Sequence, residues 1–394
     1  MSACAAASVS LYLAFTKYQV DMAVYLMGGQ HARRADLYAV HIAGRPFLSF
    51  TYPPFAAVVF SPLSQMLALR AAQALWAVLN LALLFALITL SLRVARPNVQ
   101  RPTLVRWGLL AMAPALALEP VFRTVGLGQI NLVLCVLVLF DVAGSRRLGP
   151  VTVPLGVMTG IAGAIKLTPL IFLAHLLFTR RQRGALNGLT AFGACTVGAL
   201  VLDPHASLEY WTKDVFHASR AGALFGVSDQ NIYSALSRLT HAPVSGGVLW
   251  AVTIPVAVTG LVVAASAHRR LSPMAGVLAC AAVGLLVSPI TWSHHLVWVV
   301  PAIVWLAFAE DAPSRGVRRA LAAAVLFWAA PIWWAPTTWW PSVRPPELHE
   351  NGWQLLVANS FVIALVSFLA SMATLVWRRS RRSIPATLPA NVCM

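Results

Sequence analysis

The chain has 394 residues, of which 59% are hydrophobic and only 10% are charged, and its formal net charge is +17. An ordinary soluble domain carries about 25% charged residues, so this composition excludes such a domain and indicates an all-α, polytopic membrane protein. The positive charge does not require a nucleic-acid partner, because arginines that gather in short loops beside anionic lipid produce the same excess.

Apolar segments long enough to form membrane helices recur along the chain, which we treat as a single membrane domain, residues 1–394. Runs such as "ALWAVLNLALLFALITLSL" hold roughly the 20 apolar residues that cross the hydrocarbon core. The first segment has no basic beginning and no convincing cleavage site, so we interpret it as a membrane helix and not as a signal peptide. The twelve predicted spans are 3–16, 71–92, 105–121, 127–143, 150–165, 167–179, 184–202, 247–267, 271–290, 292–309, 317–335 and 355–377.

The arginines predict the orientation of these spans. With both termini in the cytoplasm, the arginine-rich loops all lie inside, as the positive-inside rule requires. The arginines concerned are Arg93, Arg96, Arg101, Arg106, Arg146, Arg147, Arg180, Arg181, Arg183, Arg269, Arg270, Arg315, Arg318, Arg319 and those of "WRRSRR". A crossing by "YPPFAAVVFSPLSQMLAL" (52–69) would invert every later loop. Its three prolines and short length favour a helix lying in the outer interface of a plasma membrane.

This orientation places the three long loops, 17–70, 203–246 and 336–354, on the extracytoplasmic side. They are rich in Trp, Tyr, His and Pro, whereas the inside loops are short and basic. Nine of the twelve acidic residues also lie on the outer side: Asp21, Asp36, Glu119, Asp203, Glu209, Asp214, Asp229, Glu347 and Glu350. Long loops carry most binding and catalytic residues, so we expect these three to form the active-site face.

Two carboxylates in the first outer loop are candidates for a general base. Asp21 lies at the outer end of the first predicted helix, where partial desolvation would raise its pKa towards the value useful for a base. The alternative is a helix-end residue that faces water. Asp36 follows two arginines, which favours a structural ion pair, and it is the second choice for a base.

Two stretches supply polar candidates at the outer ends of helices. In "FTYPPFAAVVFSPL", the prolines after Tyr52 predict a rigid, extended entry into a helix, which is either only a turn or also the wall of a pocket. In "FRTVGLGQINLVLCVLVLF", Arg123, Gln129 and Asn131 could bind a phosphate group. The two amides could instead cap and join neighbouring helices.

Lys166 interrupts two short apolar runs in "GAIKLTPLIF". It could extend to the outer surface, or it could be a point charge that neutralises a phosphate. The absence of a neighbouring carboxylate in the sequence favours the second interpretation.

The stretch "LLVSPITWSHHLVWVVP" carries the adjacent His294 and His295 near the outer end of a helix. Adjacent helical residues point about 100° apart, so the pattern argues against a shared metal ion and favours one histidine facing a cavity while the other packs. The five cysteines show no metal or redox spacing, and we interpret them as small inert residues.

Taken in order, these motifs resemble glycosyltransferase family 87 of the GT-C superfamily, which comprises polytopic mannosyltransferases of actinobacteria that use polyprenyl-phosphate mannose. The likeness covers residues 21–301 and is carried by "DMAVYLMGG", "DLY", "FTYPPFAAVVFSPL", "GQINLVL", "KLTPLIFL", "RRQR" and "SPITWSHH". Within the family, the sequence is most similar to the α-1,2-mannosyltransferases of phosphatidylinositol mannoside, lipomannan and lipoarabinomannan assembly.

The resemblance implies a role for Asp21, because GT-C enzymes carry a catalytic aspartate just beyond the first helix. By that reading Asp21 deprotonates an acceptor hydroxyl, the lipid phosphate leaves, and an α linkage forms with inversion. Donors of this kind commonly need no metal, and the sequence holds no paired acidic motif, so we expect no cofactor.

Other functions stay open at this stage. A transporter or a flippase for lipid-linked sugars could use the same cavity without chemistry, and it would tolerate Asp21→Asn. A GT-C enzyme could also use another sugar, such as arabinose. The acceptor is not determined by the sequence.

Overall fold

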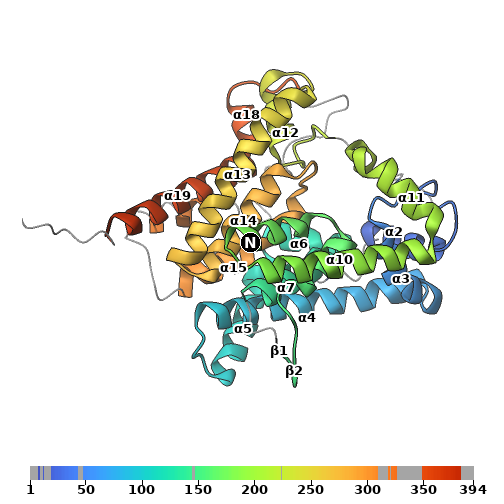
Figure 1. The fold of residues 1–394 in the computed structure, drawn as a ribbon, viewed down its shortest axis with the longest axis horizontal. Helices are drawn as coiled ribbons and strands as arrows, with labels where there is room; N and C mark the ends of the chain where they lie inside the picture. Colours follow the sequence, from blue (N-terminus) through green and yellow to red (C-terminus); the bar gives the residue numbers. More distant parts are fainter. Residues whose placement is uncertain are drawn as a thin grey trace, which may run out of the picture.

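The computed structural model describes residues 19–42, 48–143, 147–222, 224–308 and 348–382, with positions 8, 12, 318–319 and 321–325. These residues are mainly helical (Figure 1), with one two-stranded antiparallel hairpin formed by β1 (Arg147–Leu148) and β2 (Val151–Thr152). The α-helices are α2 (Val20–His31), α3 (Pro54–Met66), α4 (Leu69–Ala95), α5 (Arg101–Leu116), α6 (Glu119–Leu127), α7 (Asn131–Val142), α8 (Val157–Ile165), α9 (Ile171–Phe178), α10 (Gln182–Leu202), α11 (Pro204–Thr212), α12 (Ile232–Thr240), α13 (Gly246–Arg270), α14 (Pro273–Val287), α15 (Val299–Phe308), α18 (Trp353–Ala358) and α19 (Ser360–Arg382). The 3-10 helices are η1 (Thr168–Leu170), η2 (Asp214–Phe216), η3 (Ala218–Ala221) and η4 (Ser293–Trp298).

Four of the described helices, α4, α10, α13 and α19, are long and apolar enough to cross a membrane. The bent pair α6 and α7 would make a fifth span. The all-α prediction is confirmed for the described residues, but the twelve predicted spans are not. Several of those segments form shorter helices, namely α5, α8, α9, α14 and α15. Most of the predicted spans 3–16 and 317–335, and most of the predicted loop 336–354, lie outside the described residues.

A sharp bend separates α6 from α7, and the predicted span 127–143 corresponds mainly to α7. The two helices meet at 118°, and Gly128 ends α6 with φ +70°, a conformation that glycine adopts without steric cost. A Cβ at this position would lie 2.5 Å from Oε1 of Gln19. The bend therefore brings the backbone close to the start of α2 and leaves Gln129 between the two helices.

The first loop contains α2, a helix that the sequence analysis did not predict. Its residues from Met22 to Gly29 are all buried, so it lacks the polar face that marks a surface helix. Gly29 permits close packing on α3, because a Cβ there would lie 2.6 Å from the carbonyl oxygen of Phe60. The rigid entry into α3 is confirmed, since the helix begins at Pro54 after Pro53. The location of α3 in a membrane interface stays a prediction.

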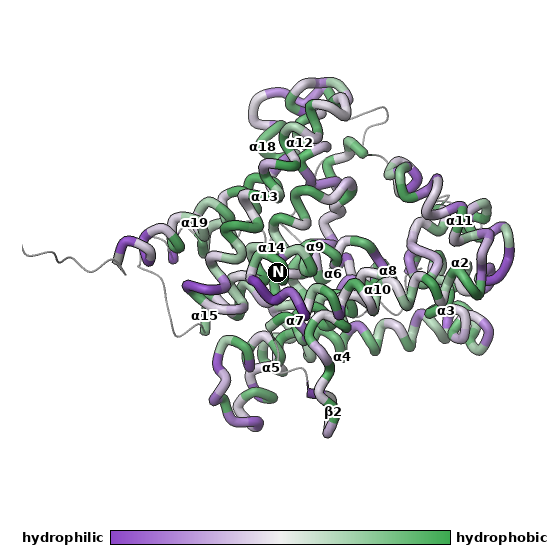
Figure 2. The backbone as a smooth tube through the Cα atoms, viewed as in Figure 1, coloured by the Kyte–Doolittle hydropathy of each residue, from purple (hydrophilic) through white to green (hydrophobic). Residues whose placement is uncertain are grey.

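The arginine-rich ends of several helices lie together. Arg269 donates to the Phe178 carbonyl at the end of α9, and Arg379 of α19 donates to the Arg270 carbonyl. Most residues along the long helices are hydrophobic, while hydrophilic residues gather at the helix ends and in the connections (Figure 2). The basic ends of α9, α13 and α19 thus share one side of the molecule. Helices α2, α3 and α11 lie on the opposite side of the fold (Figure 1).

Candidate active site

A cavity of about 740 Å³ opens among α2, α6, α8, η4 and the loop that follows α11. It brings together residues from segments almost 300 positions apart in sequence. Of the candidates chosen from the sequence, those that line it are Asp21, Tyr52, Arg123, Gln129, Lys166, His294 and His295. The structure thus brings these motifs together in one cavity, while the roles predicted for the residues stay predictions.

Asp21 lies in the first turn of α2 and is half-buried. Burial raises the pKa of its carboxyl to about 6, while the Gln129 amide and the charges of Lys166 and Arg123 oppose that rise. A carboxylate at the beginning of a helix is also stabilised by the helix dipole. Asp21 is consequently ionised at neutral pH, yet more basic than an ordinary aspartate.

A tyrosine pair fixes the amide next to Asp21. The Tyr25 hydroxyl donates to Oε1 of Gln129 at 3.0 Å, and it accepts from the Ile130 backbone N–H at 3.3 Å. The Tyr52 hydroxyl lies 3.0 Å from the same Tyr25 oxygen. Because Oε1 of Gln129 is engaged by Tyr25, its NH₂ group is directed to the carboxylate of Asp21.

Lys166 follows the last residue of α8 and extends into the cavity rather than to the outer surface. Its Nζ lies 3.2 Å from Oδ1 of Asn131, 3.0 Å from Nε2 of His295, and 5.6 Å from the centre of the Tyr52 ring. Burial lowers the pKa of the ammonium group to about 8, and the charge of Asp21 opposes this shift. Lys166 therefore supplies a positive charge to the cavity at neutral pH.

Asn131 does not line the main cavity but a smaller adjoining pocket that shares Lys166 and His295 with it, and its contact with a substrate stays a prediction. Its Nδ2 donates to the His294 carbonyl at 2.9 Å, while its Oδ1 accepts from Lys166. Thr124 donates to the same carbonyl at 2.9 Å. Asn131 thus holds both Lys166 and the histidine segment in place, which is the helix-joining role that its amide could also have had.

His294 and His295 both line the cavity, so the expectation that one would only pack is wrong. The expectation assumed an α-helix, whereas the pair begins the 3-10 helix η4. The two rings are nearly perpendicular, with centroids 4.8 Å apart. His295 contacts Lys166, while both ring nitrogens of the buried His294 have no hydrogen-bond partner among the described residues. His294 can therefore bind a ligand.

Arg123 reaches the cavity from α6 beside a buried carboxylate. Its Nε lies 3.6 Å from Oε1 of Glu119, one helical turn earlier. The same oxygen accepts from the Ser293 hydroxyl at 2.7 Å. Glu119 therefore links α6 to the segment that carries the histidines.

Asp36 does not belong to this site. It forms an ion pair with His31 at 2.8 Å, and its side chain is 49% exposed. The structural role predicted for Asp36 is supported by this contact, but the partner is His31, which is charged only when protonated, and not one of the preceding arginines.

The cavity is also lined by residues that were not selected from the sequence. They are Tyr210, Asp214, His217 and Arg220, which come from loop 203–246, together with Trp292. The composition of that loop predicted its participation, but no spacing in the sequence distinguishes these residues from their neighbours.

In the described part of the chain, no three His, Cys, Asp or Glu side chains are grouped as metal ligands. Cys135, Cys195 and Cys280 are free thiols, as expected from their spacing.

The model of glycosyltransferase family 87 matches residues 50–289. The chain is 38% identical over 318 residues to the polyprenol-phosphate-mannose-dependent α-(1-2)-phosphatidylinositol mannoside mannosyltransferase of Mycobacterium tuberculosis, covering 73% of this chain and 70% of that protein. The protein of the same description from Mycolicibacterium smegmatis is 33% identical, covering 73% and 69%. A phosphatidylinositol pentamannoside mannosyltransferase of Mycolicibacterium smegmatis is 31% identical, covering 91% and 84%. No solved structure matches significantly.

Proposed function

Because this chain belongs to glycosyltransferase family 87, we propose that it transfers mannose from polyprenyl-phosphate mannose to a phosphatidylinositol mannoside and forms an α-1,2 linkage. The relatives are described as enzymes of this reaction. The observation that carries the proposal for the site is the position of Asp21 in one cavity with Lys166 and Arg123. A lipomannan or lipoarabinomannan acceptor would suit the same chemistry.

In this mechanism Asp21 is the general base. Its carboxylate takes the proton from the 2-hydroxyl of the acceptor mannose, and the oxygen attacks the anomeric carbon of the donor. The bond from that carbon to the lipid phosphate breaks, and the electron pair leaves with the phosphate. Attack in line on a β-linked donor inverts the anomeric centre and gives an α-linked product. The pKa of about 6 suits this role, because the group is ionised and still accepts a proton.

The leaving phosphate gains negative charge as the bond breaks, and buried cations stabilise that charge in the transition state. Lys166 and Arg123 face the same cavity as Asp21 and are the proposed partners of the phosphate, and His294, whose ring nitrogens have no partner among the described residues, is proposed to donate a further hydrogen bond. Tyr52 and Gln129 hold the base in position, through Tyr25. Because two protein cations neutralise the phosphate, we propose that the reaction needs no metal ion.

We place the reaction on the extracytoplasmic face of the bacterial plasma membrane. The proposal is supported by the arginine-rich ends of α9, α13 and α19, which lie together. The cavity is lined by connections at the opposite ends of the helices, such as the segment after α11. Arginine-rich ends remain on the cytoplasmic side during insertion, so the cavity would open outward.

The experiment uses the full chain in nanodiscs with radiolabelled polyprenyl-phosphate mannose and a series of phosphatidylinositol mannosides. We expect labelled glycolipid from the wild type, with and without chelator, and a loss of at least about 10²-fold in the rate with Asp21→Asn. Asp36→Asn is the matched control, because it removes a carboxylate of the same loop that lies outside the cavity. Transfer at the normal rate by folded Asp21→Asn would exclude Asp21 as the base. No transfer by the wild type to any acceptor would favour a transporter or flippase.

A further inference from the structure

The cavity has a second group of polar lining residues, most of which come from a different segment of the chain than those assigned to the donor phosphate. This acceptor-side wall consists of Tyr210, Asp214, His217, Arg220 and Trp292. Its first four residues belong to one short segment that runs from the end of α11 through η2 and η3. The mechanism above uses none of them.

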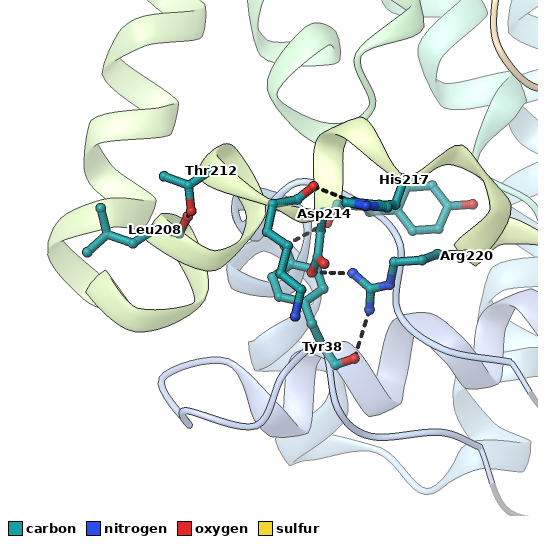
Figure 3. Close-up of polar contacts among 8 residues, drawn as sticks. Tyr38, Leu208, Thr212, Asp214, His217 and Arg220 are labelled. Atoms are coloured by element: carbon teal, nitrogen blue, oxygen red, sulfur yellow. Dashed lines mark hydrogen bonds and ion pairs between the residues drawn. The ribbon is translucent and has the colours of Figure 1, made fainter. Parts of the chain in front are cut away.

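The charged pair of this wall is held rigidly. Asp214 and Arg220 form an ion pair, and Nη2 of Arg220 donates to the Tyr38 carbonyl at 2.8 Å (Figure 3). The guanidinium also lies 5.3 Å from the centre of the Tyr38 ring, which stacks on Tyr210 with centroids 5.6 Å apart. These contacts fix Arg220 from two sides, while 23% of its side chain stays exposed. A pre-organised group of this kind binds a ligand with little loss of conformational entropy.

The two walls differ in charge. On the donor side Arg123 is paired with the buried Glu119, but Lys166 forms no ion pair with any described residue, so the charge of Lys166 is available to a phosphate. On the acceptor side Asp214 neutralises Arg220, and the Asp214 side chain is only 5% exposed. An anionic phosphate therefore gains more from the first wall than from the second.

The second wall suits a neutral, hydroxylated ligand. A carboxylate accepts hydrogen bonds from hydroxyl groups, and a guanidinium has five N–H donors, of which its two observed contacts occupy only part. The rings of Trp292 and Tyr210 add flat amphipathic surface next to these polar groups. His217 donates or accepts through Nε2, since its Nδ1 lies 2.8 Å from the Lys213 carbonyl. Aromatic rings beside convergent donors and acceptors are suited to a sugar ring.

We propose that this wall is the subsite for the mannosyl head group of the acceptor, and that Asp214, His217 and Arg220 select the acceptor by binding its hydroxyl groups. The inference rests on the proposed function, because it assumes that the donor-side residues hold the donor phosphate. The inference adds that the donor phosphate and the acceptor mannosyl group contact different groups of lining residues. The acceptor glycan enters past the segment after α11 and presents its hydroxyl to Asp21.

The test measures the Michaelis constants of both substrates for the full chain in nanodiscs. Asp214→Asn keeps the shape of the side chain and removes its charge, and we expect the KM for the phosphatidylinositol mannoside to rise about tenfold while the KM for polyprenyl-phosphate mannose stays unchanged. His217→Ala removes an exposed side chain of the same wall and is expected to raise the acceptor KM by about threefold. This second variant decides the test if Asp214→Asn fails to fold.

Thr212→Val is the matched control, because Thr212 is exposed at the end of α11, donates to the Leu208 carbonyl (Figure 3), and is not among the described residues that line the cavity. It is expected to leave both KM values unchanged. An equal rise in both KM values in the wall variants, or a rise for the donor alone, would overturn the assignment. An unchanged KM for the acceptor in folded Asp214→Asn and His217→Ala would also overturn the assignment. A wild type that transfers no mannose would overturn the proposed function itself, and the subsite with it.

Discussion

The ammonium nitrogen of Lys166 lies 3.0 Å from Nε2 of His295. An ammonium group can only donate, so Nε2 must be the acceptor, and the imidazole of His295 is neutral with its proton on Nδ1. The pair therefore holds the cation at the cavity without cancelling its charge. Because the motifs "KLTPLIFL" and "SPITWSHH" are far apart in sequence, this contact is what makes them one site.

Lys166→Met tests the role of this charge. Methionine keeps most of the volume and removes the cation, so we expect kcat to fall about 10²-fold, as for the loss of a single donor to a developing oxyanion. The measurement is steady-state transfer from polyprenyl-phosphate mannose at saturating acceptor. Arg180→Met, at an arginine beyond α9 that does not line the cavity, is the control with an unchanged rate. A normal kcat for Lys166→Met would remove Lys166 from the phosphate site.

The pH dependence of kcat/KM tests Asp21 and Lys166 together. Asp21 must be ionised to act as a base, so the rate should fall as the pH drops below about 6. Lys166 must be protonated to neutralise the phosphate, so the rate should also fall as the pH rises above about 8. The expected profile is a bell between these values, because kcat/KM reports the ionisations of the free enzyme.

Lys166→Arg separates the two limbs of this profile. A guanidinium stays protonated at every accessible pH, so the alkaline limb should move beyond the measurable range while the acid limb stays near pH 6. A profile that is flat between pH 5 and 7 would contradict the assignment of Asp21 as the base.

Tyr25→Phe tests the support of the base. The substitution removes the hydroxyl that donates to Gln129 and accepts from Ile130, so it leaves two buried polar groups unpaired at about 1–3 kcal/mol each. We expect kcat to fall about tenfold because Gln129 no longer holds Asp21, with little change in either KM. Tyr233→Phe is the control, since Tyr233 contacts Phe225 through its ring. Equal rates for Tyr25→Phe and wild type would show that the Gln129 amide does not position the base.

The sequence was sufficient to predict which motifs line one cavity. Polar residues at the ends of apolar segments avoid the hydrocarbon, so they gather at the same end of the helices. Asp21, Arg123, Gln129, Lys166 and the two histidines were all selected in this way. Helix α2 was missed because it is buried on every side and therefore shows no polar face. Several predicted spans form helices shorter than expected, so the twelve spans are not confirmed in the described part of the chain.

The acceptor-side wall could not be predicted because its residues depend on tertiary contacts. Asp214 and Arg220 form their pair within one loop, yet their place in the cavity is set by Tyr38, more than 170 positions earlier. Asn131 is the converse case, a residue that was selected from the sequence but does not line the main cavity. Its position next to Gln129 suggested substrate contact, but the start of α7 directs its amide to Lys166 and the His294 carbonyl.

Gly128→Ala tests the bend between α6 and α7. At φ +70° an alanine is strained by about 1 kcal/mol, and its Cβ would also meet Oε1 of Gln19 at 2.5 Å. We expect a lower melting temperature in detergent and a lower kcat, because Gln129 is the next residue.

Gly126→Ala is a matched control in α6, since nothing lies within 4 Å of the added Cβ. It should leave kcat unchanged and stabilise the helix slightly. Equal melting temperatures for the two variants would show that the bend is not constrained.

Asp229→Asn tests the anchor of the histidine segment. Asp229 is fully buried, and its carboxylate accepts from the Thr291 backbone N–H at 2.7 Å and from the Ser234 hydroxyl at 2.9 Å. An asparagine would direct an NH₂ group at one of these donors, so we expect the free energy of unfolding to fall by about 2–3 kcal/mol. Because Thr291 lies three residues before His294, kcat should fall as well, while the KM for the acceptor changes little. Thermal unfolding and kinetics of the same preparation measure the two effects. The control for this prediction is Asp36→Asn. It changes an exposed carboxylate and should alter the free energy of unfolding by less than about 0.5 kcal/mol. A stable Asp229→Asn variant with normal kcat would show that the Asp229 carboxylate is not needed to hold the segment carrying His294 and His295.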